Sequence, residues 1–545
     1  MNDSPLWTTL TSRERLTGTW RSAMPEYQNQ PSPCLGACPV NGRIAEWIGQ
    51  IRGGDVRGAF ETLSDNNPFP AIAGRICHHP CETVCNRIEM DETVGICSLE
   101  RFAGDTAITE GWGYTPGRDS GQSVAVIGGG PAGLSAAYQL RRQGIRVVLY
   151  EQSGALGGLM RHGIPSYRLD RAILDAEIGR ITAMGVDVRL NAEIPDRTAL
   201  EALREAHDAV YLATGASRPK RLPGLDYAES FVIDSAEFLA LPQADQTART
   251  GDRVLVIGGG SAAMDVARSA RRLGRAVTVL TLEPEGRLPA QKAEVEEAIE
   301  EGITFVSGAM LRTAKPGDAG LRLGCVRVDF RAGAEPGRFV IDPVAGSEFD
   351  LAADTIIPAI GQDADLDRWA GLLAASGPVI AAGRDWATNA PGIWAGGDVA
   401  SMGRFVTQAI GMGKEAAQAI AAHLQGRPAP SFAVPPTVGY DRINPAYQDR
   451  HGRNYQDAAP VAERLQSFAE VQQPLTADAA MSEAGRCFSC GTCTFCDNCY
   501  YYCPDMAITK LDTGYAVLSD YCKGCGLCVA ECPTGSIHMT KDQSA

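Results

Sequence analysis

Two closely spaced cysteine runs near the C-terminus constrain this chain more than any other feature. They share one spacing and read Cys493-x2-Cys496-x2-Cys499-x3-Cys503-Pro504 and Cys522-x2-Cys525-x2-Cys528-x3-Cys532-Pro533. Three thiolates at this spacing can hold three corners of a cubane, and the fourth cysteine of each run ligates the other cluster. We therefore expect one [4Fe–4S] cluster on Cys493, Cys496, Cys499 and Cys532, and a second on Cys522, Cys525, Cys528 and Cys503. Zinc also binds CxxC pairs, but two complete tandem runs disfavour it.

The other cysteines form a less regular group. Of the 17 cysteines, an N-terminal set comprises Cys34, Cys38, Cys77, Cys81, Cys85 and Cys97, and a further pair, Cys487-x2-Cys490, directly precedes the C-terminal runs. In a reducing compartment such groups indicate metal or redox sites rather than disulfides. Cys325 stands alone in a strand-like run, LRLGCVRVDF, and is predicted to be a buried apolar filler.

A dinucleotide fingerprint occupies residues 123–151, SVAVIGGGPAGLSAAYQLRRQGIRVVLYE. A β-rich run enters Gly128-x-Gly130-x-x-Gly133, a helical pattern follows, and a second strand ends at Glu151. The three glycines suit a tight turn, a close backbone approach to a pyrophosphate and helix–strand packing. The helix that starts at Pro131 offers free N–H groups from Ala132 onward. Glu151 is placed to accept hydrogen bonds from ribose hydroxyls.

The same pattern returns at residues 253–283, RVLVIGGGSAAMDVARSARRLGRAVTVLTLE. Its turn comprises Gly258, Gly259, Gly260, Ser261, Ala262 and Ala263, with alanine as an allowed third position. Two such units indicate two bound dinucleotides, or one dinucleotide and a degenerate copy; the intact glycines favour two.

The second unit favours NAD(H) over NADP(H). Aligning Gly144 with Gly274 places Thr281 where Glu151 lies, and Glu283 follows two residues later. A 2′-phosphate calls for Arg or Lys, whereas Glu283 would repel it and could pair with a free 2′-hydroxyl. Arg287 lies near in sequence, and Glu283 as a solvated loop charge is the alternative.

Three further segments suit a flavin. They are ALGGLMRHGIPSYRL with Gly158 and Leu159, VYLATGA with Thr214 and Gly215, and GIWAGGDVA with Gly397 and Asp398. The last is followed by a predicted helix from about Thr407, whose N-terminus could face the flavin.

These strings identify a family. Residues 120–425 resemble the glutamate synthase small subunit, the FAD/NAD(P)-binding half of dihydropyrimidine dehydrogenase and the large subunit of NADH-dependent ferredoxin:NADP transhydrogenase, through VAVIGGGPAGLSAA, GGLMRHGIPSYRL, VIGGGSAAMDVAR, AIGQ and IWAGGDV. The resemblance implies FAD at the first fingerprint, a nicotinamide at the second and hydride transfer between them, with no catalytic acid or base. Members that use NADPH carry an Arg pair where this chain has Leu282 and Glu283.

The resemblance extends to the N-terminal cysteines, through PCLGACP, GRICHHPCETVCNR and ICSLERF. The family's extra CxxC ahead of CxxxCP is missing here, and EAGRCFSCG near the C-terminus is similar to it. One hypothesis is that Cys487 and Cys490 fold back to join Cys34 and Cys85, while Cys38, Cys77 and Cys81 hold another cluster with Glu100 or Cys97 as fourth ligand; the family uses Gln or Glu at the position of Glu100. The alternative is a single N-terminal cluster, and about 12 rather than 16 irons per FAD would exclude the fold-back cluster.

The predicted fold class is multidomain. We expect an α-helical iron–sulfur domain (1–115), an FAD-binding Rossmann-like domain (116–250 and 385–425), an NAD(P)H-binding Rossmann-like domain (251–384), an extended linker (426–480) and a C-terminal α+β ferredoxin-like domain (481–545). Alternating strand and helix patterns over 120–425 indicate the α/β part, and a Pro-rich composition indicates the linker.

The composition and the C-terminal cysteine runs, taken with the two fingerprints, indicate an electron-transfer flavoprotein. A net charge of -15 disfavours nucleic acid as a partner, the lack of a long apolar run disfavours a membrane span, and the polar first 30 residues make the cytoplasm the expected compartment. With its C-terminal ferredoxin-like module (481–545), the chain resembles the NAD(P)-linked subunits of 2-oxoacid:acceptor oxidoreductases. It also resembles the NADH:acceptor oxidoreductase that serves dissimilatory sulfite reductase. The resemblance implies a hetero-oligomer in which ferredoxin or another subunit takes the electrons. A glutamate synthase small subunit and a cluster-based redox sensor are the rivals.

Overall fold

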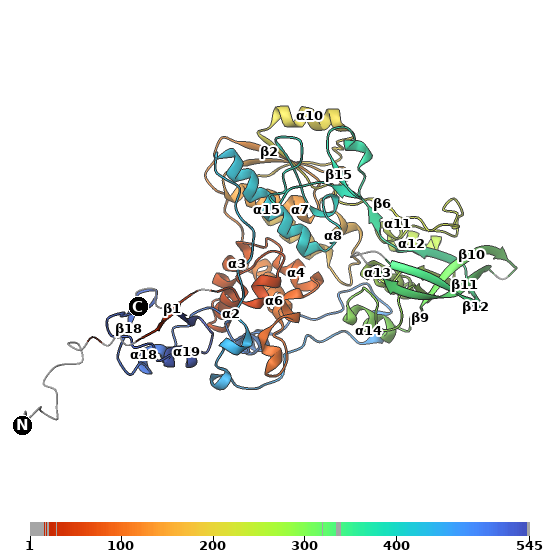
Figure 1. Cartoon of the computed structure of the whole chain (residues 1–545). Helices are drawn as coiled ribbons and strands as arrows, with labels where there is room; N and C mark the ends of the chain where they lie inside the picture. The colour runs from red at the N-terminus through yellow and green to blue at the C-terminus, as the bar shows by residue number, and fades with distance from the viewer. Residues whose placement is uncertain are drawn as a thin grey trace, which may run out of the picture.

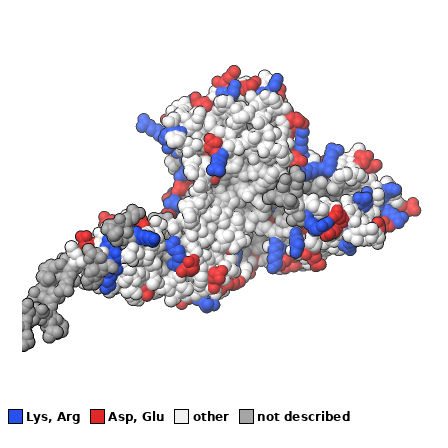
Figure 2. Space-filling view, viewed as in Figure 1, with Lys and Arg blue, Asp and Glu red and all other residues white. Residues whose placement is uncertain are grey.

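The computed structural model describes residues 16, 18, 21–28, 30–318, 320–333 and 339–541. Most of the N-terminal segment, on which the expected compartment rests, lies outside this range. Figure 1 shows a helical N-terminal region in the middle, the two parallel sheets on one side of it and the C-terminal cysteine region on the other. On the face in Figure 2, acidic and basic side chains are interspersed, and the middle of the face is largely uncharged.

The N-terminal region consists of short helices, and local signals set their starts. Proline at the first turn fits helix geometry, and Ser32 and Asp55 cap α1 and α3 through their side chains. Buried Trp47, Ile48 and Leu99 form the core together with Ala480 and Ala484 from far along the chain. The helices are α1 (Pro33–Ala37), α2 (Ile44–Arg52), α3 (Val56–Ser64), α4 (Pro70–Ile76), α5 (Pro80–Thr83), α6 (Ile96–Thr109) and the late helix α17 (Ala477–Gly485).

The first α/β unit is a parallel sheet in the order β17-β5-β2-β3-β4. Its central strand is buried at four of its five positions, as expected of a strand covered by helices on both faces. The elements are β2 (Ser123–Ile127), α7 (Pro131–Arg142), β3 (Arg146–Tyr150), α9 (Arg171–Thr182), β4 (Asp187–Arg189), α10 (Arg197–Ala206), β5 (Ala209–Leu212), β17 (Ile393–Ala395) and α15 (Val406–Leu424), which packs along α7.

The second unit repeats this plan with a parallel sheet in the order β13-β7-β8-β9. A three-stranded antiparallel sheet, β10-β11-β12, is inserted before β13 and buries Cys325 as predicted. The elements are α11 (Ser235–Ala240), α12 (Gln243–Arg249), β7 (Arg253–Ile257), α13 (Ser261–Arg272), β8 (Ala276–Thr281), α14 (Lys292–Glu300), β9 (Thr304–Ser307), β10 (Ala309–Gly317), β11 (Gly320–Ala332), β12 (Phe339–Ala353) and β13 (Thr355–Pro358).

Near the predicted boundaries 250/251 and 384/385, residues on one side of a boundary pack in the core on the other side. Ile233 and Phe238 pack in the core of the second sheet, whereas Trp369 and Ile380 pack against the first. The chain crosses between the units where β6 (Arg218–Pro219) pairs with β14 (Gln362–Asp363). We propose residues 220–361 as the extent of the second unit, because core membership depends on contacts that the fingerprint does not encode.

Residues 426–480 form an extended strap that lies along the N-terminal region and both sheet-containing units and makes contacts with each of them. The Val438 N–H donates to the Pro31 carbonyl, the Val471 N–H donates to the Tyr167 carbonyl, and Arg464 pairs with Glu300 at 2.8 Å. Short turns and the helix α16 (Val461–Arg464) interrupt it.

The C-terminal region is completed by a strand from the other end of the chain. Strand β1 (Ala23–Tyr27) pairs antiparallel with β20 (Ile537–Lys541). The remaining elements are α18 (Asn498–Tyr501), β18 (Ile508–Leu511), β19 (Gly514–Val517) and α19 (Leu527–Ala530). Among the described residues, none of the helices combines the length and apolar character that crossing a bilayer requires.

Candidate functional site

The turn after β2 has the shape that the first fingerprint requires. Gly128 has φ +108°, and a Cβ there would lie 2.3 Å from the Ala213 carbonyl oxygen. A Cβ on Gly133 would lie 1.9 Å from the carbonyl oxygen of Gly128, so α7 can approach β2 only with glycine there. Within the described part of the chain no side chain caps the start of α7, which leaves its first N–H groups available to a phosphate.

Glu151 closes this turn from the end of β3. Its carboxylate accepts the Gly129 N–H at 2.8 Å and the Ser153 N–H at 2.8 Å. These two bonds hold a buried carboxylate in place, with lone pairs left to accept from a ribose.

A cavity of about 580 Å³ extends from Glu151 to the start of α15. Its size suits a dinucleotide-class ligand. Of the predicted flavin residues it is lined by Gly128, Gly130, Pro131, Ala132, Glu151, Gly158, Leu159, Thr214, Gly215, Gly397 and Asp398. Gly133 lies beneath the turn, and Thr407 is buried in α15, where its hydroxyl lies 3.7 Å from the sulfur of Cys77.

The far end of the cavity holds the predicted Asp398 together with groups that the motifs did not mark. Burial raises the pKa of Asp398 to about 6, although nearby Arg404 opposes the shift. Arg404, Phe405, Trp369 and His78 also line the cavity. They come from loops distant in sequence, and no local pattern singles them out.

The second fingerprint reproduces the geometry of the first. Gly258 has φ +137°, and its N–H donates to Leu280 as that of Gly128 donates to Tyr150. Ala263 is buried under the turn. Ser261 and Ala262, at the start of α13, line the same cavity as the first unit, whereas Gly258, Gly259, Gly260 and Glu283 are not among the residues that line it.

Thr281 and Glu283 together lie beside the second turn, on the side where Glu151 lies in the first unit, and a Cβ on Gly259 would lie 2.8 Å from Thr281 Oγ1. A Cβ on Gly259 would lie 2.9 Å from Glu283 Oε2, and one on Gly129 would lie 3.0 Å from Glu151 Oε2. In chain register Thr281 matches Glu151, but Glu283 turns back and accepts the Thr281 hydroxyl. The structure therefore brings this predicted residue to the turn.

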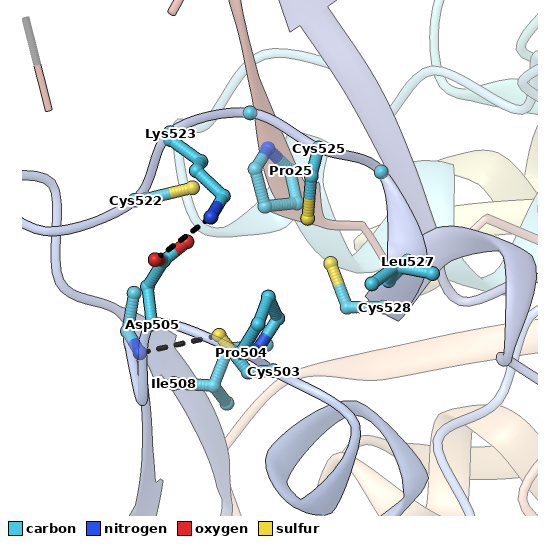
Figure 3. Close-up of a pocket in the computed structure, with 13 residues that line it drawn as sticks. Pro25, Cys503, Pro504, Asp505, Ile508, Cys522, Lys523, Cys525, Leu527 and Cys528 are labelled. Carbon is cyan, nitrogen blue, oxygen red and sulfur yellow. Dashed lines mark hydrogen bonds and ion pairs between the residues drawn. The ribbon is translucent and has the colours of Figure 1, made fainter. Parts of the chain in front are cut away.

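The C-terminal cysteines gather in two small cavities, in the crossed arrangement. One is lined by Cys493, Cys496, Cys499 and Cys532. The other is lined by Cys503, Cys522, Cys525 and Cys528, whose sulfurs face a common space in Figure 3. In the second, the Ala507 N–H donates to the Cys503 sulfur at 3.2 Å, a contact that suits a thiolate.

A third small cavity joins the two ends of the chain. It is lined by Cys34, Cys85, Cys487 and Cys490. Burial, with repulsion between the sulfurs, raises the pKa of Cys487 to about 11 and of Cys490 to about 12. Four such thiols ionise together only around a positively charged centre, so this donor set fits an iron–sulfur cluster.

Comparison with known proteins agrees with this arrangement. Residues 122–426 match the pyridine nucleotide-disulphide oxidoreductase family, residues 23–112 match dihydropyrimidine dehydrogenase domain II, 4Fe-4S cluster, and residues 515–538 match a 4Fe-4S binding domain. The chain belongs to the pyridine nucleotide-disulphide oxidoreductase family. The predicted family, fold class and enzyme class are thereby confirmed, as are the nucleotide-binding fold and the 4Fe–4S domains.

Three curated relatives of this family cover much of the chain. The chain is 34% identical to the NADP(+)-dependent formate dehydrogenase subunit beta of Moorella thermoacetica over 84% of this chain and 70% of that protein. It is 31% identical to the NADPH-Fe(3+) oxidoreductase subunit beta of Geobacter sulfurreducens (84% and 75%). It is 34% identical to the NAD-dependent dihydropyrimidine dehydrogenase subunit PreT of Escherichia coli (72% and 92%).

A fourth group of donors lies where this oxidoreductase brings its N-terminal helices to the large cavity. Cys77 follows α4, between Ile76 and His78, which both line the cavity. A hydrogen bond with Cys97 lowers the pKa of Cys77 to about 6, against the effect of burial. Cys97 also contacts Cys81, which in turn lies near Cys38.

Glu100 lies one helical turn beyond Cys97 on α6. Its carboxylate accepts from Asn67 at 2.7 Å, and burial, together with the nearby Cys77, raises its pKa. Both Cys97 and Glu100 therefore lie within reach of this group, and the geometry keeps both as candidates for the fourth ligand.

The two nucleotide-binding units of the oxidoreductase are joined by a buried ionic contact at the cavity. Arg168, from the first unit, pairs with Asp265 at 2.8 Å and with Glu294 at 2.5 Å, and both partners belong to the second unit. Burial raises the pKa of Asp265 to about 6 although Arg168 opposes the shift. The contact fixes the two fingerprints relative to each other.

Proposed function

We propose that this chain is the NADH-linked iron–sulfur flavoprotein subunit of a larger redox enzyme, with FAD at the first fingerprint, NAD(H) at the second and four [4Fe–4S] clusters. A flavin supplies the conversion between two-electron nicotinamide chemistry and one-electron iron–sulfur chemistry. The observation that carries the proposal is the cavity lined together by the first fingerprint turn, the start of α13 and the residues on either side of Cys77.

The chain's own residues would act by binding and alignment. The first turns of α7 and α13 offer N–H groups to two pyrophosphates, and Glu151 and Glu283 accept from the riboses. Arg168 would keep the two rings in register across the cavity. Hydride transfer requires close, water-free alignment and no acid or base.

Glu283 supports NADH as the nicotinamide. It stands at the ribose end of the second turn, where a carboxylate favours a free 2′-hydroxyl and opposes a 2′-phosphate. This preference is proposed for this chain alone, since its relatives include both NADP- and NAD-linked proteins by name.

The number of clusters rests on the four groups of donors. Each group supplies the four ligands of one cluster. The four proposed sets are Cys38, Cys77, Cys81 and Glu100; Cys34, Cys85, Cys487 and Cys490; Cys493, Cys496, Cys499 and Cys532; and Cys503, Cys522, Cys525 and Cys528.

The proposed partner is an enzyme of the 2-oxoacid:acceptor oxidoreductase type, which would exchange electrons with the C-terminal module. A formate dehydrogenase-type partner is the second candidate, favoured by the similarity to the Moorella subunit over 84% of this chain. Capture of the native complex through a tag on this chain, followed by assays with pyruvate and with formate, distinguishes the two.

Anaerobic purification tests the core of the proposal. We expect one FAD, about 16 irons with matching sulfide, and steady NADH-dependent reduction of a viologen dye. A Cys490→Ser variant should lose about four irons and keep its FAD. A colourless protein, or one that binds no FAD, would exclude the proposal, and a wild-type value of about 12 irons would exclude the cluster at Cys490.

A further inference from the structure

Strand β1 borders both C-terminal cysteine sites although it comes from the opposite end of the chain. Pairing with β20 places Pro25 opposite Met539 and Tyr27 opposite Ile537. Side chains two residues apart on a strand point to the same face. Pro25 lines the cavity of Cys503, Cys522, Cys525 and Cys528, as Figure 3 shows, and Tyr27 lines that of Cys493, Cys496, Cys499 and Cys532.

The hydroxyl of Tyr27 is buried in the cavity that Cys499 also lines, and among the described residues no atom, sulfur included, is in hydrogen-bonding geometry with it. The sulfur of Cys499 lies beside it. The ring of Tyr27 stacks on Tyr515 with 5.9 Å between centroids, which fixes its direction. The hydroxyl of Tyr515, by contrast, donates to Asp497 at 2.7 Å. Two stacked tyrosines thus differ in that only the first has a free O–H facing sulfur.

We propose that the Tyr27 hydroxyl donates a hydrogen bond to the sulfur of Cys499 and thereby raises the reduction potential of the cluster at that site. The inference rests on the iron–sulfur clusters of the proposed function. A cluster's sulfurs gain electron density on reduction, so a hydrogen-bond donor stabilises the reduced form more than the oxidised form. A buried hydroxyl with no other partner has this bond as its way of being satisfied. Tyr27 is therefore a positioning residue, supplied by the N-terminus to a site built at the C-terminus.

The test compares Tyr27→Phe with Tyr515→Phe in the full-length protein. Each variant keeps its ring and loses one hydroxyl. Iron, sulfide and FAD are measured first, and the potentials of the clusters are then followed by EPR during an anaerobic redox titration. We expect Tyr27→Phe to keep its iron and to shift one cluster to a more negative potential. Tyr515→Phe should match the wild type within error.

A second measurement, by ENDOR, detects the proton of the proposed hydrogen bond directly. After exchange into deuterium oxide, the wild type should show a deuteron coupled to the reduced cluster by ENDOR, and Tyr27→Phe should lose that coupling. Unchanged potentials and an unchanged coupling would overturn the inference, and so would loss of iron in Tyr27→Phe, which would make the residue structural. Absence of iron from the wild type would instead refute the proposed function.

Discussion

Replacement of Glu283 by Gln should relax the choice of nicotinamide. The change removes one negative charge and keeps the size of a side chain that lies beside Gly259 and accepts from Thr281. A free ribose hydroxyl can still bond to the amide. A 2′-phosphate would no longer face a carboxylate, so the loss for NADH should be small and the gain for NADPH large.

The magnitude follows from Coulomb's law and the half-buried position of the side chain. Two unit charges 4 Å apart interact by about 1 kcal/mol in water and about 4 kcal/mol at an effective dielectric constant of 20. A value of about 2 kcal/mol between these limits corresponds to roughly 30-fold. We therefore expect the kcat/KM ratio of NADPH to NADH to rise about 30-fold in Glu283→Gln.

The assay is anaerobic reduction of a viologen dye with each nicotinamide, after FAD and iron have been shown to match the wild type. Glu285→Gln, an exposed charge in the same loop, serves as the control and should leave the ratio unchanged. Leu282→Arg/Glu283→Arg should raise the ratio further. An unchanged ratio in Glu283→Gln would refute the assignment of Glu283 to the ribose and leave it as a loop charge.

Three further predictions concern buried ionisable groups. Arg168→Met leaves Asp265 in the interface without its cation, which should cost about 3–5 kcal/mol and lower both the melting temperature and the rate of flavin reduction by NADH; wild-type values for both would show that the contact does not align the units. Glu100→Ala should yield a cluster that lacks one iron, seen by EPR of the oxidised protein, whereas Cys97→Ser should not; the reverse result would make Cys97 the fourth ligand. Burial raises the pKa of Glu177 to about 7 from an ordinary 4.5, so the folded state binds more protons and stability should fall as pH rises from about 4.5 to about 7; Glu177→Gln should flatten that part of the melting-temperature profile, and a parallel profile would contradict the assignment.

The sequence allowed the folding of the two fingerprints to be predicted because their signals are local. A glycine at 128 or 258 is required by the turn in which it lies, and the strand and helix on either side carry their own patterns. The crossed cysteine sets were predictable for a similar reason, since spacing determines which sulfurs one loop can bring to one cubane.

The features that escaped prediction depend on contacts between distant segments. Strand β1 has only five residues, and nothing in AMPEY indicates that its partner is more than 500 positions away. Glu283 was a predicted residue, but its exact position beside Gly259 depends on how the loop after β8 turns back, which alignment of the strands alone cannot give. Trp369 lies inside the predicted range 251–384 of the second unit but packs in the core of the first sheet, a contact that the local sequence pattern does not indicate.

The C-terminal region supplies Cys487 and Cys490 to a cavity in the N-terminal region, and the N-terminal region supplies strand β1 to the C-terminal module. The order of synthesis therefore limits when the iron–sulfur centres can form. On the proposed ligand set, the cluster at Cys34 and Cys85 cannot form until Cys487 and Cys490 have been synthesised. The C-terminal module in turn needs strand β1, which is synthesised about 500 residues before it. At about 5–20 residues per second, the ribosome would need tens of seconds between the two halves of that metal centre. Iron insertion there must follow synthesis of Cys490, and removal of residues 446–545 would leave that metal centre with two of its four proposed ligands.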